Sequence, residues 1–216
     1  RHCPETMKVR LLEIERRERP YRLRMPFRFG VTTATHGRQA IVRARVALED
    51  GREAVGWSAE ALGAKWFDKN LALTDEDNHH QLRRALELAS DARLSAGADT
   101  PFGHFASGYG PQIAACAAEN LNPLIASYGQ SLVDRALLDG FCRALGIPFY
   151  KALRSNAVGL RAADVAPELG EGDLSGLFAS VVPAASIAVR HTVGLVDPIL
   201  ASDLAREARV NDGLPE

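Results

Sequence analysis

The sequence predicts an α+β fold in which a three-stranded antiparallel sheet comes first and a set of helices follows. Between Gln39 and Leu48, every second residue is apolar, as in a strand with one buried face. The pair Asp50-Gly51 comes next, and it predicts a type I′ turn into a further strand that contains Val55 and Trp57. Beyond residue 74 the apolar residues recur at helical spacing instead.

The first strand is predicted over Lys8 to Arg17. Val9 and Leu11 lie on one of its faces, and two further apolar residues lie on the other, so we expect cover on both sides. The stretch from Pro26 to Arg38 is polar and contains two glycines. We expect it to form a loop that joins the first two strands.

Capping signals divide the chain beyond residue 74 into helices. Thr74 and Asp77 form a variant of the capping box, and the helix that they begin is expected to close at Gly97. Thr100-Pro101 and Gly110-Pro111 each indicate a further helix start.

The strongest apolar stripe follows these starts. Pro123 is expected to split the segment between Gln112 and Tyr128. Ser131 is expected to begin the helix that carries the stripe, with Asp134 in its first turn. Gly146 and Pro148 end that helix in the order typical of a helix stop. Residues 156–183 show no clear period and are expected to be a linker with at most one short helix. The next strand-like run is Ile187 to Val196.

Composition limits the classes of function. The 216 residues, 23.4 kDa, allow one large domain or one domain with part of another. The 26 Lys and Arg against 27 Asp and Glu argue against a nucleic-acid partner. Without a long apolar run or a signal-like start, we expect no membrane partner and a cytoplasmic protein. Three cysteines without a CxxC pair agree with a reducing compartment, and Cys116 and Cys142 are expected in the core.

Few residues stand out as candidates for a site. His36 lies beside Thr33 in the predicted loop, where it would either contact a ligand or be an ordinary exposed side chain. Trp66 would either cap an apolar pocket or pack under the sheet, and packing is favoured. His79 and His80 are interpreted as part of a solvated helix face, because no third ligand follows at helical spacing.

Three segments, taken together, carry a resemblance to a known family. The first joins Met7-Lys8-Val9-Arg10 to Pro26-Phe27-Arg28-Phe29-Gly30, and the second is Gly56-Trp57-Ser58-Ala59-Glu60. The third runs from Asp134 through Gly140 to Leu145-Gly146-Ile147-Pro148-Phe149-Tyr150. With these segments the chain resembles the N-terminal part of enolase-superfamily proteins of the mandelate racemase and muconate lactonizing enzyme type.

The resemblance implies a capping domain over residues 7–155, made of the sheet and a helical bundle. Residues 156–216 would then be a linker and the first strand, Ile187 to Val196, of a truncated (β/α) barrel. In this family two loops close over the barrel mouth and shape substrate choice; here they correspond to about Phe29 to His36 and Glu60 to Trp66. The resemblance therefore implies Thr33, His36 and Trp66 as substrate contacts.

The resemblance also implies a chemistry, the Mg²⁺-dependent removal of a proton next to a carboxylate, as in a racemase, cycloisomerase or dehydratase. The metal ligands and the base would come from barrel strands, and a barrel takes about 250 residues. We therefore expect this chain to contain no catalytic or metal-binding residues, to bind no Mg²⁺ and to be inactive alone. The helix start at Leu214-Pro215-Glu216 also suggests a fold that continues.

Two other functions stay open. The chain would be a stand-alone interaction or oligomerisation module without catalysis, or a binder of a small anion through His36, Trp66 and the arginines. The partners that these hypotheses name are a small carboxylate substrate and a second copy of the chain.

Overall fold

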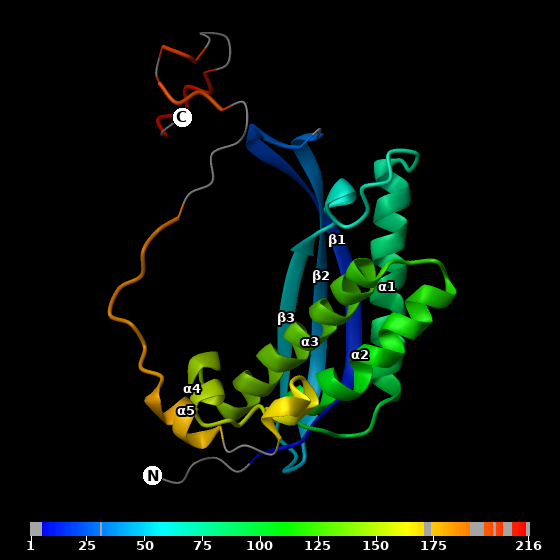
Figure 1. Cartoon of the computed structure of the whole chain (residues 1–216), viewed down its shortest axis with the longest axis vertical. Helices are drawn as coiled ribbons and strands as arrows, with labels where there is room; N and C mark the ends of the chain where they lie inside the picture. The colour runs from blue at the N-terminus through cyan, green and yellow to red at the C-terminus, as the bar shows by residue number, and fades with distance from the viewer. Residues whose placement is uncertain are drawn as a thin grey trace.

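The computed structural model describes residues 6–30, 32–170, 174–190, 197–200, 202–204 and 209–214. A three-stranded antiparallel sheet, in the order β1-β2-β3, consists of β1 (Val9–Phe29), β2 (Thr32–Leu48) and β3 (Glu53–Ala61). Helices lie against one face of this sheet, and the segment after them leads away from it (Figure 1). The α+β class and the three-stranded antiparallel sheet are thereby confirmed.

The lower half of the sheet, which in β2 runs from Ala40 to Leu48, holds the core. In β2 the residues Val42, Ala44 and Val46 are fully buried, and the residues between them are partly exposed, which confirms the predicted alternation. The long helix α3 (Pro123–Leu145) lies directly on this face. At Gly56 the contact is so close that a Cβ would collide with the backbone of α3 at Ala136 and Gly140.

The loop predicted from Pro26 to Arg38 is wrong. β1 continues to Phe29 and β2 begins at Thr32, so the two strands pair almost to the tip. The two glycines that suggested a loop have other roles. Gly30 takes a φ of 53° in the turn, and Gly37 lies within β2 under the Tyr21 side chain, where a Cβ would be 2.6 Å from the tyrosine oxygen.

The second hairpin turns at Asp50-Gly51, as predicted, but not through a type I′ turn. That type needs a positive φ at both central residues, and of this pair only Gly51 has one, at 88°. The amide of Gly51 donates to the Leu48 carbonyl at 3.0 Å, and the Leu48 amide donates to the Arg52 carbonyl at 2.8 Å. This is the pattern of a longer turn closed by a left-handed glycine.

The first long helix begins where its cap predicted. α1 (Asp75–Ser95) has Thr74 as its N-cap, and the Asp77 amide donates to the threonine hydroxyl at 3.1 Å. The Thr74 amide donates in return to the Asp77 carboxylate at 2.8 Å. The capping box is therefore confirmed.

Two predicted helix starts are wrong. α2 (Pro101–Ala118) begins at its predicted cap, Thr100, but continues through Pro111. Pro111 is exposed, so water can reach the carbonyl that its missing N–H leaves free. Likewise α3 begins at Pro123 rather than Ser131, because Asn122 caps it, and the Ser131 hydroxyl donates within the helix to the Tyr128 carbonyl.

A buried polar cluster joins the three long helices. Arg93 of α1 donates to the Asp134 carboxylate of α3 at 2.6 Å and to the His104 carbonyl of α2 at 2.7 Å. His104 contacts the Val9 carbonyl of β1 through Nε2 at 2.7 Å, so that nitrogen carries the proton. Burial lowers the pKa of His104 and raises that of Asp134.

The described residues after α3 contain four short elements: α4 (Phe149–Arg154), the 3-10 helices η2 (Ala162–Asp164) and η3 (Pro167–Leu169), and α5 (Ser175–Ser180). α3 ends at Gly146, with a φ of 66°, and Pro148 follows, as predicted. Cys116 and Cys142 are buried, also as predicted. None of the described helices is long and apolar enough to cross a membrane.

The predicted barrel strand is wrong in its described part. Residues 187–190 form no strand, and Ile187 and Val189 are 86% and 93% exposed. A strand needs a hydrogen-bonded neighbour, and the described sheet, which consists of β1, β2 and β3, does not include residues 187–190. Residues 191–196, and Pro215-Glu216 of the predicted final helix, lie outside the described residues.

Candidate functional site

The segment after β3 presents an exposed tryptophan. It forms a short 3-10 helix, η1 (Ala64–Trp66), whose Lys65 ammonium donates to the carbonyls of Asn70 and Leu73 and, at 2.8 Å, to the side-chain oxygen of Asn78. These bonds fix the segment, while Trp66 remains 61% exposed. The interpretation of Trp66 as a core residue is therefore wrong, because Lys65 and not the indole anchors the segment.

The tip of the first hairpin meets this tryptophan. Phe29 contacts Trp66 edge to face, with ring centroids 5.9 Å apart and planes at 72°, and Phe27 lies 5.9 Å from Phe29. We call Phe27, Phe29 and Trp66 the aromatic apex. Two segments that are far apart in the sequence thus form one surface, and each contributes an aromatic side chain that remains partly exposed.

The strand register separates the other two predicted residues. Phe27 pairs with Ala34, so the two share one side of the hairpin, and alternation places His36 on that side as well. Thr33 pairs with Arg28 on the opposite side. The Thr35 hydroxyl lies 2.9 Å from His36 Nδ1 and holds the ring in place. The structure thus groups His36 with the phenylalanines and separates Thr33 from them.

One arginine of the hairpin is already paired with a distant carboxylate. Arg24 donates from Nε and Nη2 to the two oxygens of Asp212, at 2.6 and 2.7 Å. These bonds lower the pKa of Asp212 to about 2. Arg24 is therefore neutralised locally, which weakens the case for an anion site built from the arginines.

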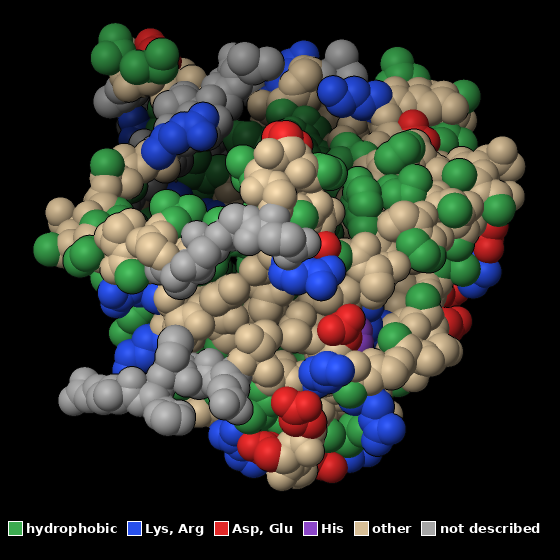
Figure 2. Space-filling model, turned by 60° about the horizontal axis from the view of Figure 1, so that its bottom comes forward, with side chains coloured by type: hydrophobic (Ala, Val, Ile, Leu, Met, Phe, Trp, Pro, Cys, Tyr) green, Lys and Arg blue, Asp and Glu red, His purple; other side chains and the backbone are tan. Residues whose placement is uncertain are grey.

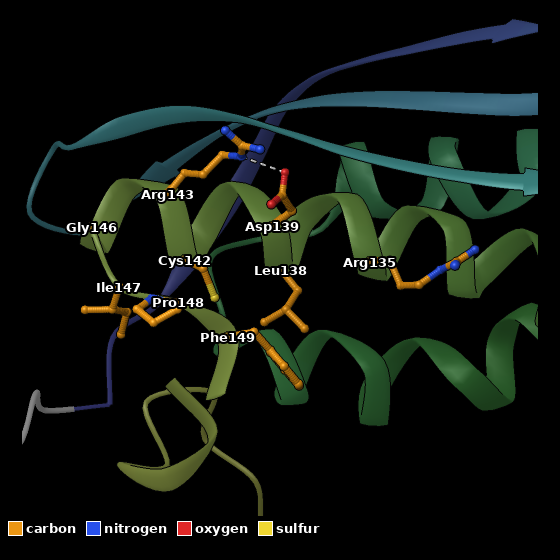
Figure 3. Close-up of a pocket in the computed structure, with 9 residues that line it drawn as sticks. All are labelled: Arg135, Leu138, Asp139, Cys142, Arg143, Gly146, Ile147, Pro148 and Phe149. Atoms are coloured by element: carbon orange, nitrogen blue, oxygen red, sulfur yellow. Dashed lines mark hydrogen bonds and ion pairs between the residues drawn. The ribbon is translucent and has the colours of Figure 1, made fainter. Parts of the chain in front are cut away.

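A separate pocket of about 440 Å³ lies at the far end of α3 and contains none of the predicted residues. Figure 3 shows Leu138, Cys142 and Phe149 pointing into it, while Arg143 and Asp139 form an ion pair at 2.8 Å at its edge. The Cys142 thiol is buried, and burial raises its pKa, so it remains protonated at neutral pH. This pocket therefore has no activated nucleophile.

The described residues contain no group of three or more His, Cys, Asp or Glu side chains that could hold a metal ion. The prediction of a solvated helix face is confirmed for His80 but is wrong for His79, whose side chain keeps only 13% of its surface exposed; the two rings lie 3.2 Å (His79) and 3.6 Å (His80) from the Glu76 carboxylate. The sequence reasoning missed Phe27 and Phe29 as site residues, although both stand in the segment that carries the family resemblance.

No family model matches the chain, and no curated protein matches its sequence. Among solved structures, the chain is similar to an enolase from alpha pretobacterium bal199 with bound Mg, with 17% identity and a TM-score of 0.44, covering 67% of this chain and 34% of that one. A mandelate racemase/muconate lactonizing protein from Herpetosiphon aurantiacus is also similar, with 18% identity and a TM-score of 0.36, covering 65% and 33%. The chain thus spans about one third of the length of each protein.

Proposed function

We propose that this chain is the N-terminal cap of an enolase-superfamily-like enzyme that removes a proton next to the carboxylate of a small substrate. The observation that carries the proposal is the contact between Phe29 and Trp66. It joins the two segments that the family resemblance assigns to the substrate entrance. In this role the aromatic apex excludes water and contacts the apolar part of the substrate, with His36 beside it.

The described residues do not fit the metal that this chemistry requires, since they offer no cluster of ligands. In the proposed enzyme Mg²⁺ would supply charge stabilisation for the deprotonated carboxylate, and it would be held by residues outside those described here. What the cap contributes is substrate selection. Taken alone, it is expected to have no catalytic activity.

The test combines the mass of the protein isolated from its source with an isotope-exchange assay. We expect the protein isolated from its source to exceed 23.4 kDa and to exchange the α-proton of a small carboxylate for deuterium in D₂O with Mg²⁺ present. Exchange is followed by NMR over a panel of hydroxy and amino acids. We expect Trp66→Ala to change KM across the panel while the melting temperature of the protein stays close to the wild-type value. A protein of 23.4 kDa from the natural source that does not exchange the α-proton would contradict the proposal.

An interaction module without catalysis is the second candidate, and exposed apolar side chains favour it. Phe149 and Tyr150 of α4 and Leu177 of α5 are 54%, 49% and 60% exposed. Figure 2, in which the bottom of the Figure 1 view is turned forward, shows hydrophobic side chains at several places on this surface. This function predicts a stable homo-oligomer of the chain in light scattering. A monomer at micromolar concentration would argue against it.

A further inference from the structure

The tip of the first hairpin contacts a turn from far along the chain. Arg24 lies in the stretch of β1 between Arg22 and Phe27, where the pairing with β2 is irregular. Its Nε and Nη2 donate to the two carboxylate oxygens of Asp212, 188 positions further on, at 2.6 and 2.7 Å. Figure 1 shows the last described part of the chain, in orange and red, beside this end of the hairpin. The contact therefore joins the first strand to a segment that lies beyond all the described helices.

Asp212 also shapes the turn that carries it. The Leu214 amide donates to Asp212 Oδ1 at 3.1 Å, so the carboxylate closes the turn over Gly213. Gly213 has a φ of 79° and Asn211 a φ of 55°, and glycine and asparagine are the residues that adopt this left-handed conformation most readily. The turn therefore holds the carboxylate in one orientation toward Arg24.

Arg24 contacts the backbone of this turn as well as its carboxylate. Nη2 donates to the Leu214 carbonyl at 3.2 Å, in addition to its bond with Asp212. Two parallel bonds from a planar guanidinium to one carboxylate form a directional contact that a lysine cannot reproduce. The side chains of Arg24 and Asp212 are 33% and 34% exposed, so dissolved ions can reach the pair. These features fit a contact that is specific and can also be released.

The chain that leads to the turn has little structure of its own. Residues 181–190 contain no helix or strand, and all of them are exposed. Val182, Ile187 and Val189 keep 76%, 86% and 93% of their surface exposed. A segment with so few buried contacts opens at a low free energy, and the entropic cost of closing a loop rises only slowly with its length. The turn can therefore leave the hairpin while the core stays folded.

We propose that residues 212–214 form an intramolecular latch that docks on Arg24 and limits the opening of the hairpin tip. None of the residues from Thr32 to Gln39 in β2 is buried, so this end of the hairpin has little other cover. With the latch closed, Arg24 fixes β1 in its irregular stretch. With the latch released, the tip and the aromatic apex open more often. The latch uses contacts within this chain and does not depend on the proposed enzymatic function.

Salt, rather than mild acid, is the condition that releases the latch. The bonds from Arg24 and from the Leu214 amide lower the pKa of Asp212 to about 2. A carboxylate with a lowered pKa keeps its contact above the ordinary value and loses it as the pH falls through the lowered one. The latch therefore stays charged at neutral and mildly acidic pH, whereas dissolved ions screen an exposed pair at any pH.

Hydrogen exchange of the full chain at pH 7, followed by mass spectrometry, tests the latch. Arg24→Gln and Asp212→Asn should each raise the exchange rate of the hairpin amides between Arg22 and His36 about threefold, the scale of one exposed ion pair. Arg17→Gln is the matched control, because it removes the same charge from the same strand and breaks a pair with Glu15 instead. It should leave these amides unchanged. Wild-type exchange in both latch variants would overturn the proposal.

The double variant and salt show whether the two side chains act together. Arg24→Gln combined with Asp212→Asn should exchange no faster than either single variant, because each alone already opens the latch. Additive increases would overturn the proposal. Raising NaCl from about 10 mM to about 1 M shortens the Debye length from about 30 to about 3 Å and should speed exchange of these amides in the wild type. Arg24→Gln should lack this response, and an equal response would overturn the proposal.

Discussion

The two halves of the sheet belong to the same strands but differ in what covers them. From Ala40 to Leu48, β2 alternates between buried and partly exposed residues beneath α3. From Thr32 to Gln39 no residue of the same strand is buried, and β1 opposite it contains a register irregularity between Arg22 and Phe27. Covering helices therefore fix the lower half, whereas local pairing and the aromatic apex hold the upper half.

This difference explains why a binding surface can lie on the upper half. Close packing constrains the size and shape of the side chains under α3, since protein interiors tolerate little change in volume. The aromatic apex has no such constraint, because Phe27 and Trp66 keep more than a third of their surface exposed. A strand pair can thus be rigid at one end and present variable side chains at the other.

Substituting one phenylalanine in each half should give the largest contrast. Phe141→Ala leaves a cavity under the sheet, because this side chain is fully buried, and should lower the free energy of unfolding by about 3–5 kcal/mol. Phe27→Ala in the aromatic apex should lower it by less than about 1 kcal/mol. Urea denaturation measures both values. Similar losses would mean that the upper half is as tightly packed as the lower.

Overpacking the lower half should come next in size. Gly56→Ala places a Cβ against the backbone of α3 and should cost about 1–3 kcal/mol. Gly97→Ala is the matched control, since nothing lies within 4 Å of its added Cβ. Thermal unfolding should separate the two variants by several degrees. A neutral Gly56→Ala would show that α3 can move away from the sheet.

Removing the cap of α1 tests an element beside the sheet. Thr74→Ala deletes the hydroxyl that accepts from the Asp77 amide and should cost about 1 kcal/mol. Thr74→Ser retains that acceptor and should stay close to wild type. Urea denaturation of the two variants checks this, and equal losses would exclude the capping bond as the cause.

The buried histidine should give a pH dependence of stability. His104 has a lowered pKa in the folded state, so the unfolded chain binds the proton more readily. Stability is therefore fully present above the ordinary histidine pKa of about 6.5 and is lost as the pH falls below it. The polar groups packed around it are Arg93, Asp134 and Asp99 together with the Val9 carbonyl. His104→Gln should flatten the dependence of the free energy of unfolding between pH 6.5 and 5. An unchanged slope would assign the dependence to other groups.

Sequence patterns predicted the elements whose signals are local. Thr74 and Asp77 marked the start of α1, and Gly146 marked the end of α3, because each acts on backbone groups within one helical turn. Ser131 misled the prediction for α3, since a serine inside a helix can donate to a carbonyl of its own turn. The true cap, Asn122, stood just before Pro123 and was the better signal.

The candidate site was less predictable because it depends on contacts distant in sequence. Nothing near Trp66 shows that Lys65 anchors the segment, which leaves the indole exposed. That Thr33 and His36 point to different sides of the hairpin follows only from the strand register, and a segment predicted as a loop has no register.

Native-state hydrogen exchange of β2 tests the division of the sheet most directly. Amides of the lower half should exchange only with global unfolding, whereas paired amides between Thr32 and Gln39 should exchange through local opening at a clearly lower free energy. Mass spectrometry with fragmentation resolves the two stretches in one experiment. Uniform protection along the whole strand would contradict the account, because the upper half would then be as fixed as the core.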